Sequence, residues 1–391
     1  MSDVKPITLL DGFEVFRAWL GTDNDLQALA AVLAAAAIMW LDGDPVWLLL
    51  VSGPGNAKTE TVQTLASVGA HIVSSIASPG ALLSATSAKE KTKTATGGLL
   101  REIGELGLLV IKDFTTILSQ SRNMRAEVLA ALREIFDGYW SRAVGTDGGR
   151  TIEWRGRLVV IGAVTTAWDA AHEVLSSMGD RFVLVRMDST RGRVAAGRRA
   201  ISNTGDEVTM REELAAAVAG VLANVDPTAD FELTDAESVR ILDVADVVTQ
   251  ARTAVEYDYR GDVVGAHAPE MPTRFAKQLA QIFRGAVAIG MPRKKALRLA
   301  IRCGRDSMPP LRLLILEDVA ANPGAATREV TRRVEKPRST VDRQLQALDV
   351  LGLLSKKEDP SMFGGREVLT WRYTVTEGVN VGALTQKTPR K

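Results

Sequence analysis

A glycine-containing segment near residue 55 has the residue types of a phosphate-binding loop. A continuously apolar run precedes it and helix-compatible residues follow it, so backbone N–H groups and the positive end of a helix are expected to point at a phosphate. Lys58 would then reach the β- and γ-phosphates of a nucleotide, and the hydroxyl of Thr59 would bind Mg²⁺. The candidate nucleotide-binding residues are Ser52, Gly53, Pro54, Gly55, Asn56, Ala57, Lys58, Thr59 and Glu60.

This segment matches G-x-x-x-x-G-K-[ST] only in part, because Ser52 occupies the first glycine position and Ala57 the second. The alternative interpretation is a Gly/Pro turn before an unrelated helix. The surrounding pattern favours the loop, since short apolar runs alternate with helical stretches, which is typical of a parallel sheet covered on both faces. The expected strands are 46–51, 70–75, 107–111, 158–164 and 182–185, and a hairpin is expected within 139–154.

The alanine before Lys58 and the order of these elements resemble the AAA+ ATPases. The resemblance is especially to the branch that holds the minichromosome-maintenance helicases, the MoxR-type ATPases and the bacterial enhancer-binding ATPases. The resemblance covers about Val46 to Met308. It implies an α/β fold, with the parallel sheet of a P-loop NTPase and helices on both faces, followed by an α-helical lid. It also implies that the nucleotide is ATP, with Mg²⁺ beside it.

In that family the next functional element is the Walker B strand, and Leu108 to Phe114 is similar to it. Two alignments are open. In one, Lys112 replaces the metal-binding aspartate and Asp113 takes the place of the catalytic glutamate. In the other, Asp113 lies on the metal side and Phe114 stands where the general base belongs. Either way one carboxylate remains, which cannot readily both organise the metal shell and accept a proton, so we expect weak hydrolysis.

The resemblance assigns further catalytic candidates. Thr165 and Thr166, at the end of the fourth expected strand, correspond to the sensor 1 position that orients the attacking water, although many strands simply end in threonine. Arg274 is similar to the sensor 2 arginine of the lid, with a solvated helix arginine as the alternative.

The segment from Ser176 to Phe182, which contains Arg181, looks like the loop that carries the arginine finger in the helicase branch. An arginine there stabilises transition-state charge in the neighbouring subunit. This role implies a ring or open spiral, commonly a hexamer in the family. The alternative is an intrachain salt bridge to Asp180 or Asp188.

The region after Pro309–Pro310 is similar to a winged helix-turn-helix domain, with three helical patterns followed by two strand-like pieces, Leu353–Lys356 and Val368–Thr376. Short polar residues open its third helix and Arg and Gln follow one turn later, which suits phosphates and base edges in a major groove. The candidate DNA-binding residues are Arg338, Ser339, Thr340, Arg343, Gln344, Lys356, Lys357 and Arg366. Two further loops, 89–94 and 147–150, resemble family devices that grip DNA or, in MoxR-type proteins, protein clients.

Composition sets the remaining expectations. A formal net charge of +1 means that any affinity for DNA must be local. One cysteine, no basic-then-apolar leader and no apolar stretch long enough to span a bilayer indicate a cytoplasmic protein without a membrane partner. The expected segments are a helical 1–44, an AAA+ core 45–190, a lid 191–308, a winged helix 309–378 and a disordered tail 379–391.

Three functions fit this sequence. The first is an oligomeric ATPase acting on DNA, helicase-like or replication-initiator-like, which the helicase-like lid, the hairpin and the winged helix favour. The second is an ATP-gated DNA-binding switch with little hydrolysis, which regulates transcription or loads a helicase; the depleted Walker B strand favours it. The third is a MoxR-like chaperone that remodels proteins.

Overall fold

The computed structural model of the protein describes residues 4–22, 24–85, 96–145, 148–171, 181–229, 231–363 and 366–385, with the backbone alone for residues 361–363 and 366–368. The chain divides into two compact units. The first contains Met1–Ala170, Arg181–Leu233 and Ala280–Leu299, and the second contains Ala171–Asp180, Thr234–Leu279 and Ala300–Lys391.

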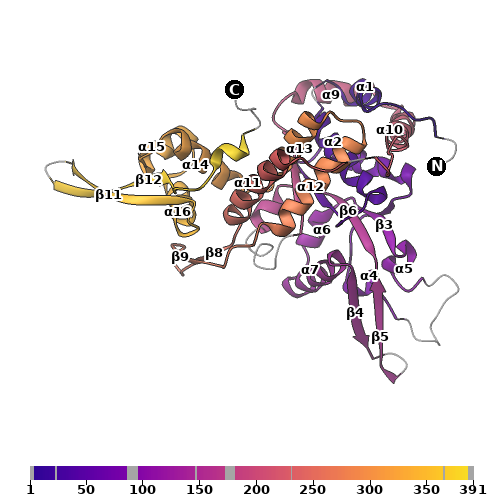
Figure 1. The fold of residues 1–391 in the computed structure, drawn as a ribbon, viewed down its shortest axis with the longest axis horizontal. Coiled ribbons are helices and arrows are strands. Elements are labelled where there is room, and N and C mark those ends of the chain that lie inside the picture. Colours follow the sequence, from indigo (N-terminus) through magenta and orange to yellow (C-terminus); the bar gives the residue numbers. More distant parts are fainter. Residues whose placement is uncertain are drawn as a thin grey trace. The chain divides into compact units, whose positions relative to one another are not determined.

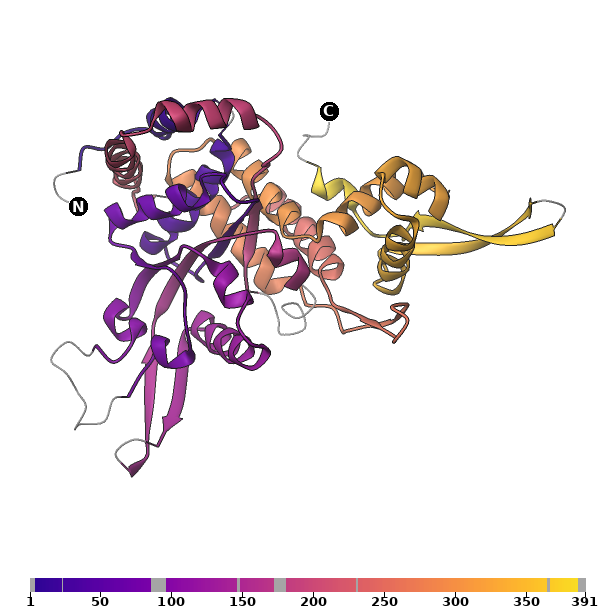
Figure 2. The ribbon, with the colours of Figure 1, turned by 180° about the vertical axis from the view of Figure 1, so that it is seen from behind.

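A five-stranded parallel sheet is the centre of the first unit (Figures 1 and 2). Its strand order is β2-β3-β6-β1-β7. All five residues of β1 are buried, as are seven consecutive residues of β6, which accounts for their continuously apolar sequences. The expected α/β architecture with a parallel sheet flanked by helices is confirmed. The strands are β1 (Trp47–Val51), β2 (His71–Val73), β3 (Leu106–Ile111), β6 (Arg157–Val164) and β7 (Val183–Arg186).

Helices flank this sheet, and the expected hairpin is present as an antiparallel pair, β4 (Tyr139–Val144) and β5 (Arg150–Arg155). The N-terminal region belongs to the same unit, because Ala28–Ala37 of the second helix are all buried and pack on β1, β6 and β7. It is therefore part of the sheet's packing rather than a body of its own. The helices are α1 (Leu9–Leu20), α2 (Leu26–Ala37), α3 (Lys58–Gln63), α4 (Pro79–Leu82), α5 (Leu99–Ile103), α6 (Phe114–Leu118), α7 (Arg122–Phe136), α9 (Arg193–Ser202) and α10 (Glu207–Leu222), with 3₁₀ turns at Ile38–Trp40 and Thr64–Val68.

The region after residue 190 is not purely helical, contrary to expectation. Helix α11 (Asp235–Ala251) is followed by an antiparallel hairpin, β8 (Val255–Tyr257) and β9 (Val263–Ala266). The apolar and β-branched residues of β8 continue the apparent helical pattern, so periodicity alone misses the change. Helices α12 (Thr273–Ala288) and α13 (Arg293–Asp306) come next, and the boundary between the units runs through both.

The C-terminal part of the second unit contains three helices and a three-stranded antiparallel sheet of order β10-β12-β11. Strand β11 is ten residues long, much longer than the expected Leu353–Lys356, whereas β12 is close in length to the expected Val368–Thr376. The polar residues 357–359 carry no strand signal, and pairing with β12 holds them extended. The elements are α14 (Pro310–Ala321), β10 (Ala325–Ala326), α15 (Thr327–Val334), α16 (Arg338–Val350), β11 (Leu354–Phe363), β12 (Arg366–Val375) and a 3₁₀ turn at Val381–Leu384.

A membrane-crossing helix is not found in the described parts of the chain, where every helix is too short or too polar.

The packing of Tyr373 on β12 predicts a pH dependence of stability. Burial first, and then the nearby carboxylates of Asp342 and Asp349, raise the pKa of Tyr373 to about 12. An unfolded tyrosine has a pKa of about 10, so between these values the unfolded state loses its proton first. The free energy of unfolding is therefore expected to fall as the pH rises from about 10 to 12.

Urea unfolding at several alkaline pH values measures this effect, with Tyr373→Phe as the matched variant. The phenylalanine variant should lose that part of the pH dependence, and one of the four tyrosines should ionise later than the others by ultraviolet absorbance. Ionisation of all four tyrosines together in the native protein would contradict the prediction.

Candidate nucleotide-binding site

The loop between β1 and α3 has a closed, tightly turned backbone. Ser52 N–H donates to the carbonyl of Val164 at the end of β6 (3.3 Å). The side-chain amide of Asn56 donates to Ser52 Oγ (2.8 Å) and to the carbonyl of Asp188 after β7 (3.3 Å). These bonds tie the loop to the ends of both strands that neighbour β1.

The loop turns through two left-handed residues, Gly55 (φ +77°) and Ala57 (φ +51°). Ala57 occupies the position where the nucleotide-binding pattern has its second glycine, and its methyl group makes this conformation unfavourable by about 1 kcal/mol or more. The conformation that glycine normally supplies is therefore retained here by an alanine.

Ala57→Gly is accordingly expected to raise the free energy of unfolding by about 0.5–1 kcal/mol. The gain is the relief of the left-handed strain, reduced by the greater freedom of glycine in the unfolded chain. Denaturant unfolding measures the change. Ala195→Gly, in the exposed helix α9, is the matched control and should destabilise instead. A loss of stability at position 57 as large as that at 195 would contradict the proposed strain.

Lys58 lies inside the loop rather than in solvent. Only 8% of the residue is exposed, and its Nζ donates to the carbonyls of Ser52 (2.9 Å) and Gly53 (2.6 Å). Burial lowers the pKa of Lys58, and the negative charge of Asp113 partly opposes that effect. The ammonium group of Lys58 is thus hydrogen-bonded to two neutral oxygens, and its positive charge is favoured by Asp113, just beyond the end of β3.

Asp113 lies just beyond the end of β3 and caps helix α6. Its carboxylate accepts from the backbone N–H of Thr115 (3.1 Å) and from the hydroxyl of Thr116 (2.7 Å). The next residue, Phe114, is fully buried and packs edge-on against Trp168 (ring centroids 5.9 Å apart). Of the adjacent positions 113 and 114, only Asp113 therefore presents a polar group at this edge of the sheet.

Thr165, at the end of β6, contacts Thr115, a residue near Asp113 that was not among the predicted site residues. Its backbone N–H donates to Thr115 Oγ1 (3.1 Å), and the two hydroxyl oxygens lie 3.3 Å apart. Thr115 could have been noticed because it follows the candidate acid by two residues. Thr166 instead begins a turn, with its carbonyl accepting from Asp169 N–H (3.1 Å).

The strand order explains why these side chains meet. From β1 the chain crosses to β2 on one side of the sheet, and from β6 it crosses to β7 on the other side. The carboxyl ends of β1 and β6 are neighbours, and such a switch point is where open parallel sheets bind ligands. Lys58, Asp113, Thr115 and Thr165 all lie at this edge.

Besides Thr166, three predicted residues in the first unit do not join this group directly. Thr59 is exposed on the first turn of α3. Glu60 forms a two-bond ion pair with Arg211 of α10, with both distances 3.0 Å. The side chain of Arg181 is 12% exposed and pairs with Asp137 (3.3 Å). The preceding loop, 176–180, is outside the described residues.

Arg274 lies in the second unit, where Glu270 holds it at 3.3 Å. Glu270 also pairs with the buried Arg252 at 2.6 Å.

The predicted DNA-binding residues lie on α16 and β11, and several already have partners. Arg338 and Ser339 are exposed at the start of α16, and Thr340 is half-buried. Arg343 donates to the carbonyl of Arg260 at the tip of the β8–β9 hairpin (3.2 Å).

Gln344 accepts from Arg312 Nε (3.2 Å). Lys356 pairs with Asp349 (2.8 Å) and lies 5.1 Å from the ring centroid of Trp371. Lys357 is exposed. The side chain of Arg366, the loop 89–94 and residue 147 are outside the described residues, and Arg150 is exposed at the start of β5.

Comparison with known proteins does not assign the chain to a family. No protein-family model matches the sequence, and no curated protein matches it. Among solved structures, the chain aligns with an apo A form of the NrS-1 C-terminal region with a TM-score of 0.31 and 11% identity, covering 96% of this chain and 78% of that one. A second apo structure of that region, residues 305–718, aligns with a TM-score of 0.27 and 11% identity over 96% and 77% of the two chains.

Proposed function

We propose that the protein is an ATP-binding ATPase of the AAA+ type that acts on DNA as an oligomer with shared ATP sites. The observation that carries the proposal is the buried Lys58, which begins the helix of a strand–loop–helix segment and whose positive charge is favoured by Asp113. Both residues lie where a parallel sheet places its ligands.

In the loop without nucleotide, Lys58 can replace its hydrogen bonds to loop carbonyls by hydrogen bonds to phosphate oxygens. Lys58 Nζ is bound by two neutral carbonyls, and phosphate oxygens are stronger acceptors for an ammonium group. A triphosphate in the loop would draw Lys58 to its β- and γ-oxygens, and Thr59 and Asp113 are the residues that would hold Mg²⁺. When bound, Mg²⁺ neutralises charge on the phosphates.

Weak hydrolysis is expected from the way in which Asp113 is held. Both of its carboxylate oxygens already accept hydrogen bonds, from Thr115 N–H and Thr116 Oγ1. An acid so fixed is well placed beside a cation and poorly placed to remove a proton from water. Arg181 would have to leave Asp137 to act on a neighbouring subunit.

The second candidate function follows from the same observation. With one carboxylate at this edge, ATP would serve mainly to drive assembly, and the protein would be a DNA-binding switch with little turnover.

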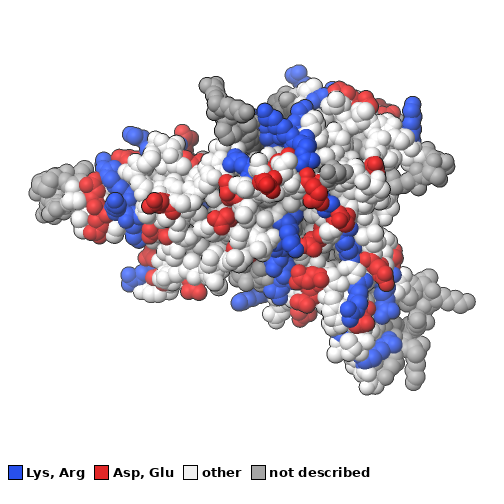
Figure 3. All heavy atoms as spheres, in the orientation of Figure 1, with Lys and Arg blue, Asp and Glu red and all other residues white. Residues whose placement is uncertain are grey.

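For DNA, the α14–β10–α15–α16–β11–β12 order supports a winged helix with α16 as the recognition helix. Arg338 and Ser339 are exposed at its start, where base edges or phosphates are reached. Charged residues of both signs are interspersed over the face drawn in Figure 3, which is consistent with local rather than global attraction for DNA. To contact DNA, Arg343 would have to give up its hydrogen bond to the carbonyl of Arg260.

ATP turnover with and without single- and double-stranded DNA tests this proposal. Turnover should rise with DNA, and Arg338→Glu should remove that rise without changing turnover in the absence of DNA. Lys294→Glu, an exposed lysine on α13, is the control. Tight ATP binding with no turnover would favour the switch, whereas DNA-independent turnover that Arg338→Glu leaves unchanged would remove DNA from the proposal.

A further inference from the structure

Helix α9 buries none of its ten residues, which is unusual for a helix in a folded unit. Isolated helices of this length are marginal in water, and most helices gain their stability by packing an apolar face. Val194 and Ile201 are 71% and 76% exposed. Together with Arg198 they follow an i, i+4, i+7 spacing and so lie along one side of the helix.

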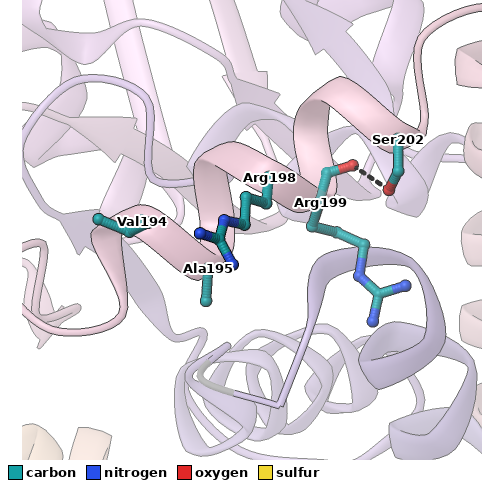
Figure 4. A pocket seen from close by; sticks show the side chains of 5 residues that line it. All are labelled: Val194, Ala195, Arg198, Arg199 and Ser202. Atoms are coloured by element: carbon teal, nitrogen blue, oxygen red, sulfur yellow. Dashed lines mark hydrogen bonds between the residues drawn. The ribbon is translucent and has the colours of Figure 1, made fainter.

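Positive charge accompanies these apolar residues. Arg193, Arg198 and Arg199 make no ion pair with any residue that the structure describes. A shallow hollow of about 630 Å³ lies against the helix. Figure 4 shows its lining side chains, Val194, Ala195, Arg198, Arg199 and Ser202. We call Val194, Arg198 and Ile201, together with Arg199 on the flank of this line, the α9 stripe. Its chemistry fits a partner that is apolar at its centre and acidic at its edges.

The second unit carries a surface of that kind on α11. Val239 and Leu242 are 59% and 49% exposed, and Asp235 and Asp246 are exposed on either side of them. These four residues follow an i, i+4, i+7, i+11 spacing, which places them along one side of α11. We call them the α11 stripe. It matches the α9 stripe in apolar content and has the opposite charge.

We propose that the α9 stripe of one copy of the chain binds the α11 stripe of the next copy. Docking would bury four exposed aliphatic side chains and place the arginines of α9 beside the aspartates of α11. Because the two stripes are different surfaces, each copy keeps one free stripe after pairing. Such head-to-tail contacts build a ring if the rotation closes and an open spiral if it does not. The inference deepens the proposed oligomer with shared ATP sites, on which it rests for its function.

Charge reversal and reciprocal mixing test this interface with the full chain. Mass in solution is measured by sedimentation and light scattering, with and without Mg·ATP. The wild-type chain should exceed the monomer mass of 42.1 kDa. The double variant Arg198→Glu/Arg199→Glu and the double variant Asp235→Arg/Asp246→Arg should each weaken association at least ~100-fold, since like charges then face each other.

The mixture of the two variants separates a true interface from misfolding. Each variant is repelled by itself, but each offers the stripe that the other needs, so an equimolar mixture should recover the wild-type mass. This recovery also excludes a contact between the two stripes of one chain. Lys294→Glu/Lys295→Glu, exposed on α13, is the control and should assemble normally.

A wild-type chain that stays monomeric, assemblies that survive either reversal, or reversals that mixing does not rescue would each overturn the interface. ATP binding is measured on the same samples. If ATP still binds while the interface fails, the proposed nucleotide site stands and only the interface is lost.

Discussion

Replacing Lys58 by alanine is expected to weaken the binding of Mg·ATP about 100-fold or more. Charge-assisted hydrogen bonds to phosphate are among the strongest polar contacts, and losing about 2.7 kcal/mol of them corresponds to that factor. Lys58 is the buried ammonium group of the loop, and no other residue of Ser52 to Glu60 is basic. Equilibrium titration with ATP in the presence of Mg²⁺ measures the effect.

The fold should survive this change. Burial lowers the pKa of Lys58, so the ammonium is held at a cost, and its removal also removes that cost. Thermal unfolding without nucleotide is therefore expected to differ little from wild type. Lys295→Ala, an exposed lysine on α13, is the matched control. Equal ATP affinity in Lys58→Ala and Lys295→Ala would mean that the loop does not bind the phosphates.

Replacing Asp113 by asparagine is expected to reduce ATP turnover about 100-fold or more while ATP binding changes by less than about tenfold. The asparagine keeps the size of the side chain and one oxygen, which can still accept from Thr115 N–H and cap α6. It loses the negative charge beside Lys58 and the proposed cation. Steady-state turnover and nucleotide titration on the same preparation separate the two effects.

Glu127→Gln, which removes an exposed carboxylate from α7, is the control for a general effect of charge. If Asp113→Asn hydrolyses ATP as fast as this control, then the carboxylate that organises the reaction lies elsewhere in the chain.

The parallel sheet could be predicted because its strands are buried on both faces. Runs such as Trp47–Val51 and Arg157–Val164 have no polar residue within the buried part, so no helix or half-exposed strand explains them as well. The β8–β9 hairpin could not be predicted in the same way. Val255 follows the last turn of α11 at helical spacing, and only pairing with Ala266, eleven residues later, makes it a strand.

The direction of the strands made it possible to predict which residues of the candidate site lie near one another. Parallel strands end at one edge of a sheet, so Lys58, Asp113 and Thr165 had to lie near one another once their strands were recognised. The partners of individual side chains depend on three-dimensional packing instead. Lys58 donates to the carbonyls of its own loop, and Arg181 forms an ion pair with Asp137. The spacing of these residues in the sequence does not predict either contact.

Titration of the purified, nucleotide-free wild-type chain with ATP in the presence of Mg²⁺ is the most direct measurement of the central claim. We expect one site per chain, with micromolar affinity, that is lost when Lys58 is replaced by alanine. Absence of binding at millimolar ATP, or binding that Lys58→Ala leaves unchanged, would contradict the assignment of residues 52–59 as a nucleotide-binding loop.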